Sequence, residues 1–418
     1  MAEKQQEDIR KSMQDMDFEV EFSQNLPAIF KYLNFSLAFT SYQAERLILI
    51  RSDGEDLDIN YKTFSRPMGL TANEDSLTLG TFAQIVKFQR EDSLIEQIKQ
   101  PLAKIEEDIT APRLKSNAKQ TELHDDNSDV EFLDLTEAEK VKHQERYKRW
   151  QSYQESLYSP VDNRVDACYI TRSSHYSGMI NIHDIDWGDE GLWAVNSSFS
   201  CLCTIEPDFS FVPQWKPFFI SELVPEDRCH LNGMALKDGK PAYVTTFSKF
   251  DEAAKWRDGE KFDGTLMDVA SNRILLDGLS MPHSPRYHQG RLYFCDSGLG
   301  LVCYYDQESQ SKKVIAEVPG FTRGVDFYGT LMFVGLSKVR QSGVTKPAPL
   351  AERYKQTYSG IWIFNLEDNS LVGTIKFTGN IDQIYDVAVL NDCSFPELIE
   401  PSSPRIRNHF CIPDGYPN

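Results

Sequence analysis

Leu292-Tyr-Phe-Cys-Asp-Ser-Gly-Leu-Gly-Leu-Val-Cys-Tyr-Tyr305 contains two short apolar stretches joined by small and polar residues. Apolar and aromatic runs of this length, separated by Ser, Asp and Gly, are typical of two antiparallel strands and their turn. The same pattern recurs at residues 37–50, 77–88 and 192–205, and it begins again at Tyr243 and Leu331. The chain is therefore built from an internal repeat.

Each repeat contains more than this pair of strands. A further short apolar strand precedes most of the pairs, and a fourth apolar stretch follows, as in residues 211–215 and 313–318. The preceding strands begin near residues 68, 183, 230, 283 and 323. Four short strands per unit, with units roughly 40 to 60 residues apart, indicate the blades of a β-propeller.

The two ends of the repeat region complement each other. Residues 386–390 form an innermost strand with no second strand after it, whereas the pair that begins at Leu37 has no innermost strand before it. Pairing the two would complete a blade and leave no open sheet edge. The sequence thus predicts an all-β fold, a six-bladed β-propeller closed by its N- and C-terminal strands. A two-sheet sandwich would leave the missing strands unexplained.

Segments without the repeat divide the chain further. We expect a helical extension over residues 1–34, blades over 35–90 and 161–397, and a tail over 398–418. Residues 91–160 are charged and lack the repeat spacing, and Thr136-Glu-Ala-Glu139 is a capping box. They are predicted to form a partly helical, partly loose insertion, through which a protein partner could bind.

Composition limits the function classes. A net charge of −19 argues against a nucleic-acid surface. No apolar run reaches the length of a membrane span, and the first residues lack a secretion signal. The eight cysteines are scattered through apolar runs, as expected for buried thiols in a reducing compartment. We therefore expect a cytoplasmic protein that binds neither nucleic acid nor membrane.

Strand direction alternates within a blade, so the loops that enter the innermost strands lie on the same face as those joining the second and third strands. Loops on a rigid scaffold often carry function. His183, His230 and His283 each open a repeat on this face. They are candidates for acid–base catalysis or for a divalent metal site. The alternative is that each imidazole only bonds backbone carbonyls.

Arginines form the second group of candidates. Arg66, Arg286 and Arg323 could bind a carboxylate or phosphate of a ligand. They could equally pair with Asp184, Asp326 and Asp386 to connect neighbouring blades. The remaining ligand-binding candidates on this face are Gln43, Asn196, Asn232, Tyr385 and Asp386.

Several longer motifs resemble a known family. They include His230-Leu-Asn-Gly-Met-Ala-Leu236, Ser280-Met-Pro-His-Ser-Pro-Arg286 and Tyr385-Asp-Val-Ala-Val-Leu390. The chain resembles, from about residue 35 to 396, a bacterial family of conserved hypothetical proteins known only as a domain of unknown function. The resemblance implies a propeller-like repeat protein and brings no activity or catalytic residue with it.

Two hypotheses about function follow. In the first, the charged face binds a small polar or anionic molecule or a peptide, with hydrolase or lyase chemistry as a further option. His183, His230 and His283 would then act on the ligand, Asn232 would orient it, and Arg286 and Arg323 would clamp it. In the second, the protein is a non-catalytic interaction scaffold that uses the insertion and the propeller face. The sequence contains no nucleophile elbow, phosphate-binding glycine loop or dinucleotide fingerprint.

Overall fold

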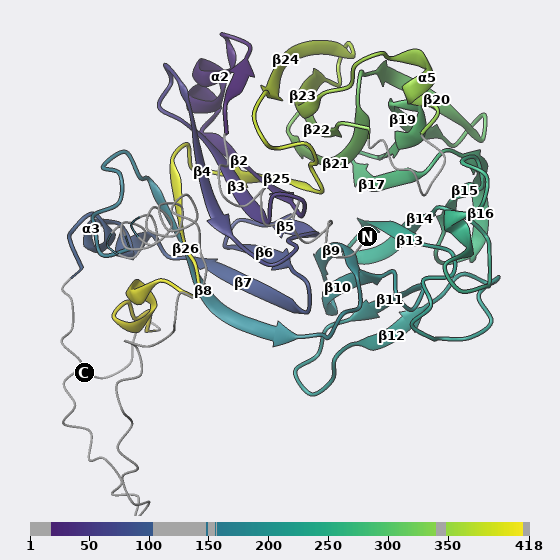
Figure 1. The fold of residues 1–418 in the computed structure, drawn as a ribbon, viewed down its shortest axis with the longest axis horizontal. Coiled ribbons are helices and arrows are strands. Elements are labelled where there is room, and N and C mark those ends of the chain that lie inside the picture. The colour runs from purple at the N-terminus through teal and green to yellow at the C-terminus, as the bar shows by residue number, and fades with distance from the viewer. Residues whose placement is uncertain (1–17, 103–147, 149–154, 156, 340–347, 413–418) are drawn as a thin grey trace, which may run out of the picture. The chain divides into compact units, whose positions relative to one another are not determined.

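The structure is a computed structural model that describes residues 18–102, 148, 155, 157–339 and 348–412. The strands form six sheets of four or five strands each. The innermost strands of neighbouring sheets contact one another in a closed cycle around a central axis (Figure 1). The described chain is therefore a six-bladed β-propeller, which confirms the predicted all-β fold.

The blades are numbered here around the ring, and the strands of each are given from the axis outward. Blade 1 contains β25 (Val387–Asn391), β2 (Phe35–Ser41), β3 (Arg46–Ser52) and β4 (Leu57–Thr63). Blade 2 contains β5 (Leu70–Ala72), β6 (Ser76–Gly80), β7 (Gln84–Arg90), β8 (Ala167–Tyr176) and β26 (Pro396–Ile399). Blade 3 contains β9 (Ile182–Gly188), β10 (Gly191–Asn196), β11 (Cys201–Thr204) and β12 (Val212–Trp215).

Blades 4 to 6 complete the ring in the same way. Blade 4 contains β13 (Leu231–Lys237), β14 (Lys240–Thr246), β15 (Gly264–Asp268) and β16 (Arg273–Leu279). Blade 5 contains β17 (Pro282–His288), β18 (Arg291–Asp296), β19 (Leu301–Asp306) and β20 (Ser311–Glu317). Blade 6 contains β21 (Phe321–Tyr328), β22 (Leu331–Ser337), β23 (Ser359–Asn365), β24 (Ser370–Phe377) and β1 (Val20–Phe22).

Blade 1 is assembled from both ends of the repeat region. Its innermost strand, β25, pairs antiparallel with β2 in a register that places Phe35 opposite Asn391 and Phe39 opposite Val387. This is the closure that the sequence predicts. Every blade therefore has a neighbour on both sides, and no face of a blade is left open at a gap in the ring.

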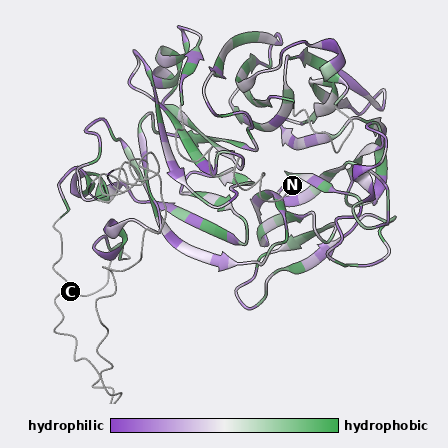
Figure 2. Cartoon of the chain, in the orientation of Figure 1, coloured by the Kyte–Doolittle hydropathy of each residue, from purple (hydrophilic) through white to green (hydrophobic). Residues whose placement is uncertain are grey.

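The core lies between the blades. The buried apolar side chains form six clusters, and each cluster combines residues of two adjacent blades. In β18, Leu292 and Phe294 pack towards blade 4, whereas Tyr293 and Cys295 pack towards blade 6. Successive side chains of a strand point to opposite faces of a sheet, so a strand between two blades can be apolar on both faces. Figure 2 shows apolar residues concentrated in the strands.

Hydrogen bonds between innermost strands add a polar connection between blades. An aspartate of one innermost strand accepts the backbone N–H of the next, in the pairs Asp184 with Met234 (2.9 Å), Asp386 with Leu70 (3.0 Å) and Asp326 with Val389 (2.7 Å). Between blades 5 and 6, the Gly324 N–H donates to Ser284 Oγ at 2.9 Å. Gly324 has φ +78, and a Cβ there would lie 2.8 Å from the Val387 nitrogen, so this position requires glycine.

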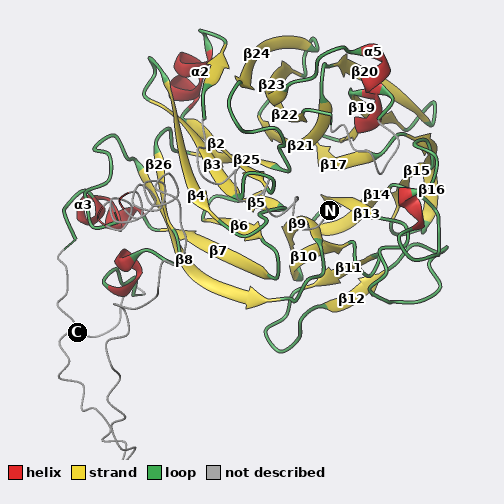
Figure 3. Cartoon of the chain, in the orientation of Figure 1, coloured by secondary structure: helices red, strands yellow, loops and turns green. Residues whose placement is uncertain are grey.

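Helices are short and few in the part of the chain that the structure describes (Figure 3). The α-helices are α2 (Leu26–Leu33), α3 (Ile95–Ile98) and α5 (Leu350–Arg353), and none of the described helices is long and apolar enough to cross a membrane. Short 3-10 helices occur at Asp92–Leu94, Lys255–Arg257, Ser297–Leu299 and Pro404–Arg407. The predicted N-terminal helical extension contains α2, but it also contributes β1, which adds to the outer edge of blade 6. Residues 1–17 and the predicted capping-box helix of the insertion lie outside the described residues.

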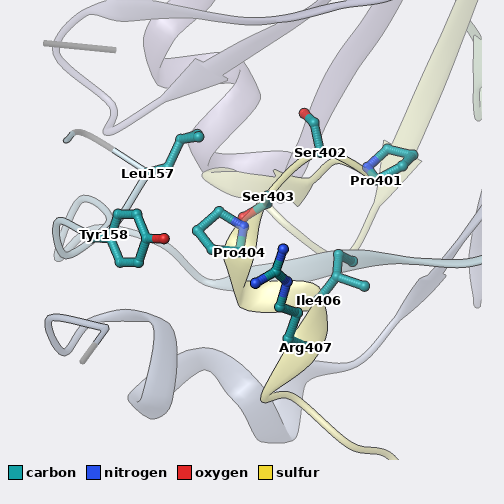
Figure 4. Close-up of a pocket in the computed structure, with 8 residues that line it drawn as sticks. All are labelled: Leu157, Tyr158, Pro401, Ser402, Ser403, Pro404, Ile406 and Arg407. Atoms are coloured by element: carbon teal, nitrogen blue, oxygen red, sulfur yellow. The ribbon is translucent and has the colours of Figure 1, made fainter. Parts of the chain in front are cut away.

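Residues 93–165 and 399–418 form a second compact unit. Within it, Arg405 donates to the backbone carbonyls of Gln100 and Ser159 at 3.0 and 2.8 Å. Figure 4 shows a pocket of about 370 Å³ in this unit, in which Leu157 and Tyr158 lie opposite a proline-bounded turn. The turn contributes Pro401, Ser402, Ser403, Pro404, Ile406 and Arg407.

Candidate functional site

One polar side chain from each blade lies where the chain enters the innermost strand. We call this set the mouth ring: Arg66, His183, His230, His283, Arg323 and Tyr385. The ring of His183 lies 4.6 Å from that of His230 and 5.6 Å from that of Tyr385, centroid to centroid. All six residues are candidates from the sequence, and the structure places them around one end of the channel.

Loops between second and third strands contact the mouth ring. The hydroxyl of Ser197, which follows β10, lies 2.8 Å from His183 Nδ1. The hydroxyl of Ser297, which follows β18, lies 3.0 Å from His283 Nδ1. These contacts place both kinds of loop on one face, as the alternation of strand direction predicts.

His183 and His283 are held by the same pair of contacts in alternate blades. Nδ1 of His183 lies 2.9 Å from the carbonyl oxygen of Asn181, and Nδ1 of His283 lies 2.9 Å from that of Met281. A carbonyl oxygen can only accept, so Nδ1 carries the proton and Nε2 carries the lone pair. Each imidazole therefore bonds a backbone carbonyl, which is one of the alternatives raised by the sequence, and still retains a second nitrogen as an acceptor.

Both of these imidazoles are electrically neutral near pH 7. Burial lowers the pKa of His183 well below its usual value, and the nearby His230 and Arg323 lower it further. Burial lowers the pKa of His283 in the same way, with the charge of Arg323 as the next contribution. Arg66 also contributes to the lowered pKa of His183, so both arginines act electrostatically on the mouth ring.

Arg323 is a half-buried cation at this end of the channel. Its guanidinium carbon lies 3.4 Å from the centroid of the Tyr385 ring. Within the described residues, no carboxylate lies at ion-pair distance from Arg323, and the buried Tyr385 hydroxyl has no hydrogen-bond partner. Burial raises the pKa of Tyr385, so its hydroxyl stays protonated. A guanidinium without a carboxylate beside a hydroxyl is suited to binding an anion.

Arg286 has a different environment. Its Nη1 and Nη2 donate to the two carboxylate oxygens of Asp184 at 2.7 and 3.0 Å, and Nη2 lies 3.5 Å from Asp386. It also donates to the carbonyl of Met234 at 3.0 Å. The guanidinium is thus used to connect blades 1, 3, 4 and 5. This arrangement matches the alternative in which an arginine pairs with aspartates of neighbouring blades.

Residues of several innermost strands also line a small cavity that contains two acidic side chains. The cavity measures about 110 Å³ and is lined by Leu70, Thr71, Ala72, Ile185, Asp186, Arg286, Val325, Asp326, Val387 and Ala388. The Thr71 hydroxyl donates to Asp186 at 2.8 Å. Burial raises the pKa of Asp186, and it raises the pKa of Asp326 to about 6.

The other sequence candidates have structural contacts. The side-chain oxygen of Asn196 accepts the Phe199 N–H at 3.0 Å, which closes the turn between β10 and β11. The side-chain oxygen of Gln43 accepts the Asp382 N–H at 3.3 Å. Asn232 is buried in β13, and its Nδ2 has no hydrogen-bond partner in the described chain. Asp386 accepts the N–H groups of Leu70 and Val387.

A metal ion fits the mouth ring poorly. Among the residues that the structure describes, no group of three His, Cys, Asp or Glu side chains is arranged to hold one. Nδ1 of each ring histidine is already engaged. The charges of Arg66 and Arg323 would also oppose a divalent cation. The arrangement of donors and charges is better suited to an anion.

The sequence does not predict the contacts that surround His230. Its Nδ1 lies 2.9 Å from Asp227 Oδ1, and its ring stacks on Trp256 at 3.9 Å between centroids. Phe247 packs against the same ring at 4.6 Å. Asp227 is only three residues before His230, a spacing that could have suggested the pair. Trp256 and Phe247 lie in a longer loop whose path the sequence does not determine.

The comparisons with solved structures concern the fold alone. A chain of the nidogen/laminin complex has a TM-score of 0.46 and 10% identity, covering 86% of this chain and 99% of its own length. A catalytically inactive virginiamycin B lyase from Staphylococcus aureus, solved with quinupristin, has a TM-score of 0.36 and 9% identity, covering 86% of this chain and 100% of its own. No curated protein matches the chain.

The family comparison covers most of the sequence. One family model matches residues 24–136 and 133–399, a span that includes every described strand except β1 and every residue of the mouth ring. The chain belongs to the family described as Domain of unknown function (DUF4915).

Proposed function

We propose that the protein binds a small organic acid at the mouth ring. The observation that carries this proposal is the environment of Arg323, whose guanidinium lies over Tyr385 without a carboxylate partner in the described residues. Arg286, in the innermost strand of the neighbouring blade, is neutralised by Asp184. A ligand carboxylate would pair with the Arg323 guanidinium as the Asp184 carboxylate pairs with that of Arg286.

The rest of the ring supports the same class of ligand. His183 and His283 present neutral Nε2 acceptors, which suit the hydroxyl groups of a hydroxy acid. Arg66 adds a second positive charge, and its guanidinium carbon lies 5.4 Å from the centroid of the Phe82 ring. A small acid that also carries hydroxyl groups would satisfy both the cations and the imidazoles.

Thermal unfolding with a panel of anions tests the proposal. The panel contains lactate, malate, gluconate, glucuronate and inorganic phosphate at constant ionic strength. A ligand at a hundred times its Kd stabilises the folded state by about 2.7 kcal/mol. We expect at least one carboxylate to raise the Tm of the natural protein, and we expect Arg323→Gln to remove the effect.

Arg273→Gln serves as the matched control because Arg273 is exposed and begins β16, at the β15–β16 turn. The control should respond to the acid as the natural protein does. Equal responses in the Arg323→Gln and Arg273→Gln variants, or no response to any carboxylate, would contradict the proposal.

One observation favours protein binding as a second candidate function. Several large apolar side chains are exposed at the end of β8 or in loops that join second to third strands or lead into the next blade: Phe82, Tyr176, Met179, Leu223 and Phe262. Exposed apolar groups of this kind occur at protein interfaces. Under this interaction-scaffold hypothesis, changing Tyr176 and Met179 to Ser would release a copurifying protein while leaving Tm unchanged. Retention of that protein by the double variant would contradict it.

We also infer that the protein resides in the cytoplasm. Its seven buried cysteines are not in disulfide bonds, as expected in a reducing compartment. Fractionation of cells that express the full chain would test this, and recovery outside the cytoplasm would contradict it.

A further inference from the structure

His230 differs from the other two histidines in the partner of its Nδ1. That nitrogen lies 2.9 and 3.1 Å from the two carboxylate oxygens of Asp227. The indole N–H of Trp256 donates to the same carboxylate at 3.0 Å, and Arg257 lies 3.8 Å from it. Because a carboxylate only accepts, Nδ1 of His230 carries the proton and Nε2 has the lone pair. Asp227 thus fixes both the tautomer and the orientation of the ring.

The Asp227 carboxylate gives His230 a negatively charged partner, which the other two ring histidines lack within the described residues. His183 and His283 donate to neutral carbonyl oxygens, and burial lowers their pKa values. His230 alone in the mouth ring has an acidic partner at salt-bridge distance, which would balance the positive charge of an imidazolium. Within one site, two histidines are therefore held by backbone carbonyls, and one is oriented by a carboxylate, as a general base is.

The surroundings of His230 are apolar and rigid. Trp256 stacks on its ring at 3.9 Å, Phe247 lies at 4.6 Å, and the side chain is 9% exposed. Asp227 and His230 both have positive φ, +49 and +51, which costs a residue other than glycine roughly 1 kcal/mol or more. The structure holds both residues in a strained backbone conformation that brings the carboxylate and the imidazole together.

Nε2 of His230 has no hydrogen-bond partner in the described residues, and the ring contacts His183 within the mouth ring. The same ring contains Tyr385, 5.6 Å from His183, and Arg323 over Tyr385. An acid whose carboxylate is bound by Arg323 would therefore lie in the same small group of side chains as the His230 lone pair. The proton acceptor and the anion-binding groups belong to one site.

We propose that His230 is a general base that removes the proton from the carbon next to the carboxylate of the bound acid. This inference rests on the proposed binding function. The Nε2 lone pair takes the proton, and the C–H electron pair moves onto the carboxylate to give an enediolate. Arg323 and Arg66 stabilise this additional charge, and Asp227 acts as the positioning residue for His230. The imidazolium exchanges its Nε2 proton with a solvent proton, and transfer of that proton from Nε2 to the same carbon completes the exchange and consumes no further reactant.

The apolar surroundings favour proton removal from carbon over activation of water. Trp256 and Phe247 restrict the access of water to the imidazole, and a desolvated base is more effective towards a weak carbon acid. Two guanidinium groups near the carboxylate suit the negative charge that develops on its oxygens.

The experiment follows deuterium incorporation by proton NMR. The full-length protein is incubated in D₂O with lactate, malate, gluconate and glucuronate, and the signal of the proton next to each carboxylate is measured over time. For an acid that binds in an Arg323-dependent manner, we expect that signal to decrease. His230→Asn keeps a donor towards Asp227 but removes Nε2, so it should slow exchange by at least about 100-fold while changing the binding constant by less than about threefold.

Asp227 is tested by its own pair of variants. Asp227→Asn should lower kcat for exchange with little change in KM, because the carboxylate acts on the base and not on the ligand. Asp227→Glu should restore part of the rate, since it restores the charge. A merely structural role of Asp227 would instead lower Tm and raise KM together in both variants. Arg273→Gln should exchange as fast as the natural protein.

The outcomes separate the two proposals. An acid that binds through Arg323 but exchanges no proton, or exchanges equally fast with His230→Asn, overturns the catalytic inference and leaves the binding function intact. Absence of Arg323-dependent binding by every acid tested overturns both.

Discussion

Arg323 and Tyr385 come from neighbouring blades, and the guanidinium carbon lies 3.4 Å from the ring centroid. The aromatic face attracts the cation, and the blade that follows Arg323 in the ring thus helps to hold its side chain. Burial lowers the pKa of Arg323, and Tyr385 and Asp386 oppose this effect. The cation is therefore retained by an aromatic ring and by distant charge, without a direct ion pair in the described residues.

Removing Arg323 should make His183 and His283 easier to protonate. In both cases burial is the main reason for the lowered pKa, and the charge of Arg323 adds to it. Arg323→Gln should therefore raise both pKa values, although burial will keep them below the usual value. Titration of the imidazole proton resonances by NMR measures the change. Unchanged values would show that the guanidinium does not act on these rings.

The contribution of His183 and His283 to stability should decrease as the pH falls below about 6.5, the pKa of a histidine in an unfolded chain. The raised pKa of Asp326 acts in the opposite direction over this range. His183 and His283 have lower pKa values when folded, so the unfolded state binds more protons in this range. Their contribution is present above pH 6.5 and decreases with falling pH, by at most about 1.4 kcal/mol per pH unit for each histidine. Urea unfolding between pH 7 and 5 measures this slope.

His283→Asn is the matched variant for this pH effect. The asparagine amide can still donate to the carbonyl of Met281, but it does not titrate. The variant should therefore lose less stability between pH 7 and 5 than the natural protein does. An unchanged slope would assign the acid sensitivity to other groups.

Arg286 should be essential for stability because it neutralises Asp184 and lies near Asp386, both buried. Arg286→Met would leave these carboxylates without their cation. Breaking a buried ion pair from one side typically costs about 3–5 kcal/mol. Urea unfolding at pH 7 should show a loss of this size, whereas Arg273→Met, at an exposed position, should change stability by less than about 0.5 kcal/mol. Similar losses in both variants would exclude this role for Arg286.

The packing between blades can be tested with two phenylalanines. Phe294 is 1% exposed between blades 4 and 5, and Phe209 is 59% exposed in the β11–β12 connection. Phe294→Ala should destabilise the protein by about 3–5 kcal/mol, and Phe209→Ala should have little effect. Thermal or urea unfolding compares the two. A small effect of Phe294→Ala would mean that the blades do not share a core at this position.

The fold could be predicted from the sequence because each blade carries the same local signals. Alternating apolar residues predict strands, and the unmatched strands near Leu37 and Asp386 predict the closure. The strand pattern and the unmatched strands can both be recognised from the residues within short stretches of chain. The arrangement of Arg66, Arg323 and the histidines on one face also follows from strand direction.

The chemistry of the site could not be predicted to the same extent. Arg286 and Arg323 occupy comparable places in sequence, yet only Arg286 meets an aspartate in the structure. That difference depends on side-chain contacts between blades, which spacing does not encode. The Asp227–Trp256 contact depends in addition on the path of a long loop.

The pairing of β2 with β25 also has a consequence for biosynthesis. On the ribosome, β2, β3 and β4 emerge long before β25, the strand that completes their sheet. Until then the edge of β2 is unpaired, and such edges can join with other chains. A contact between such distant segments also closes slowly. We therefore expect the newly made chain to need protection by chaperones until β25 has been released.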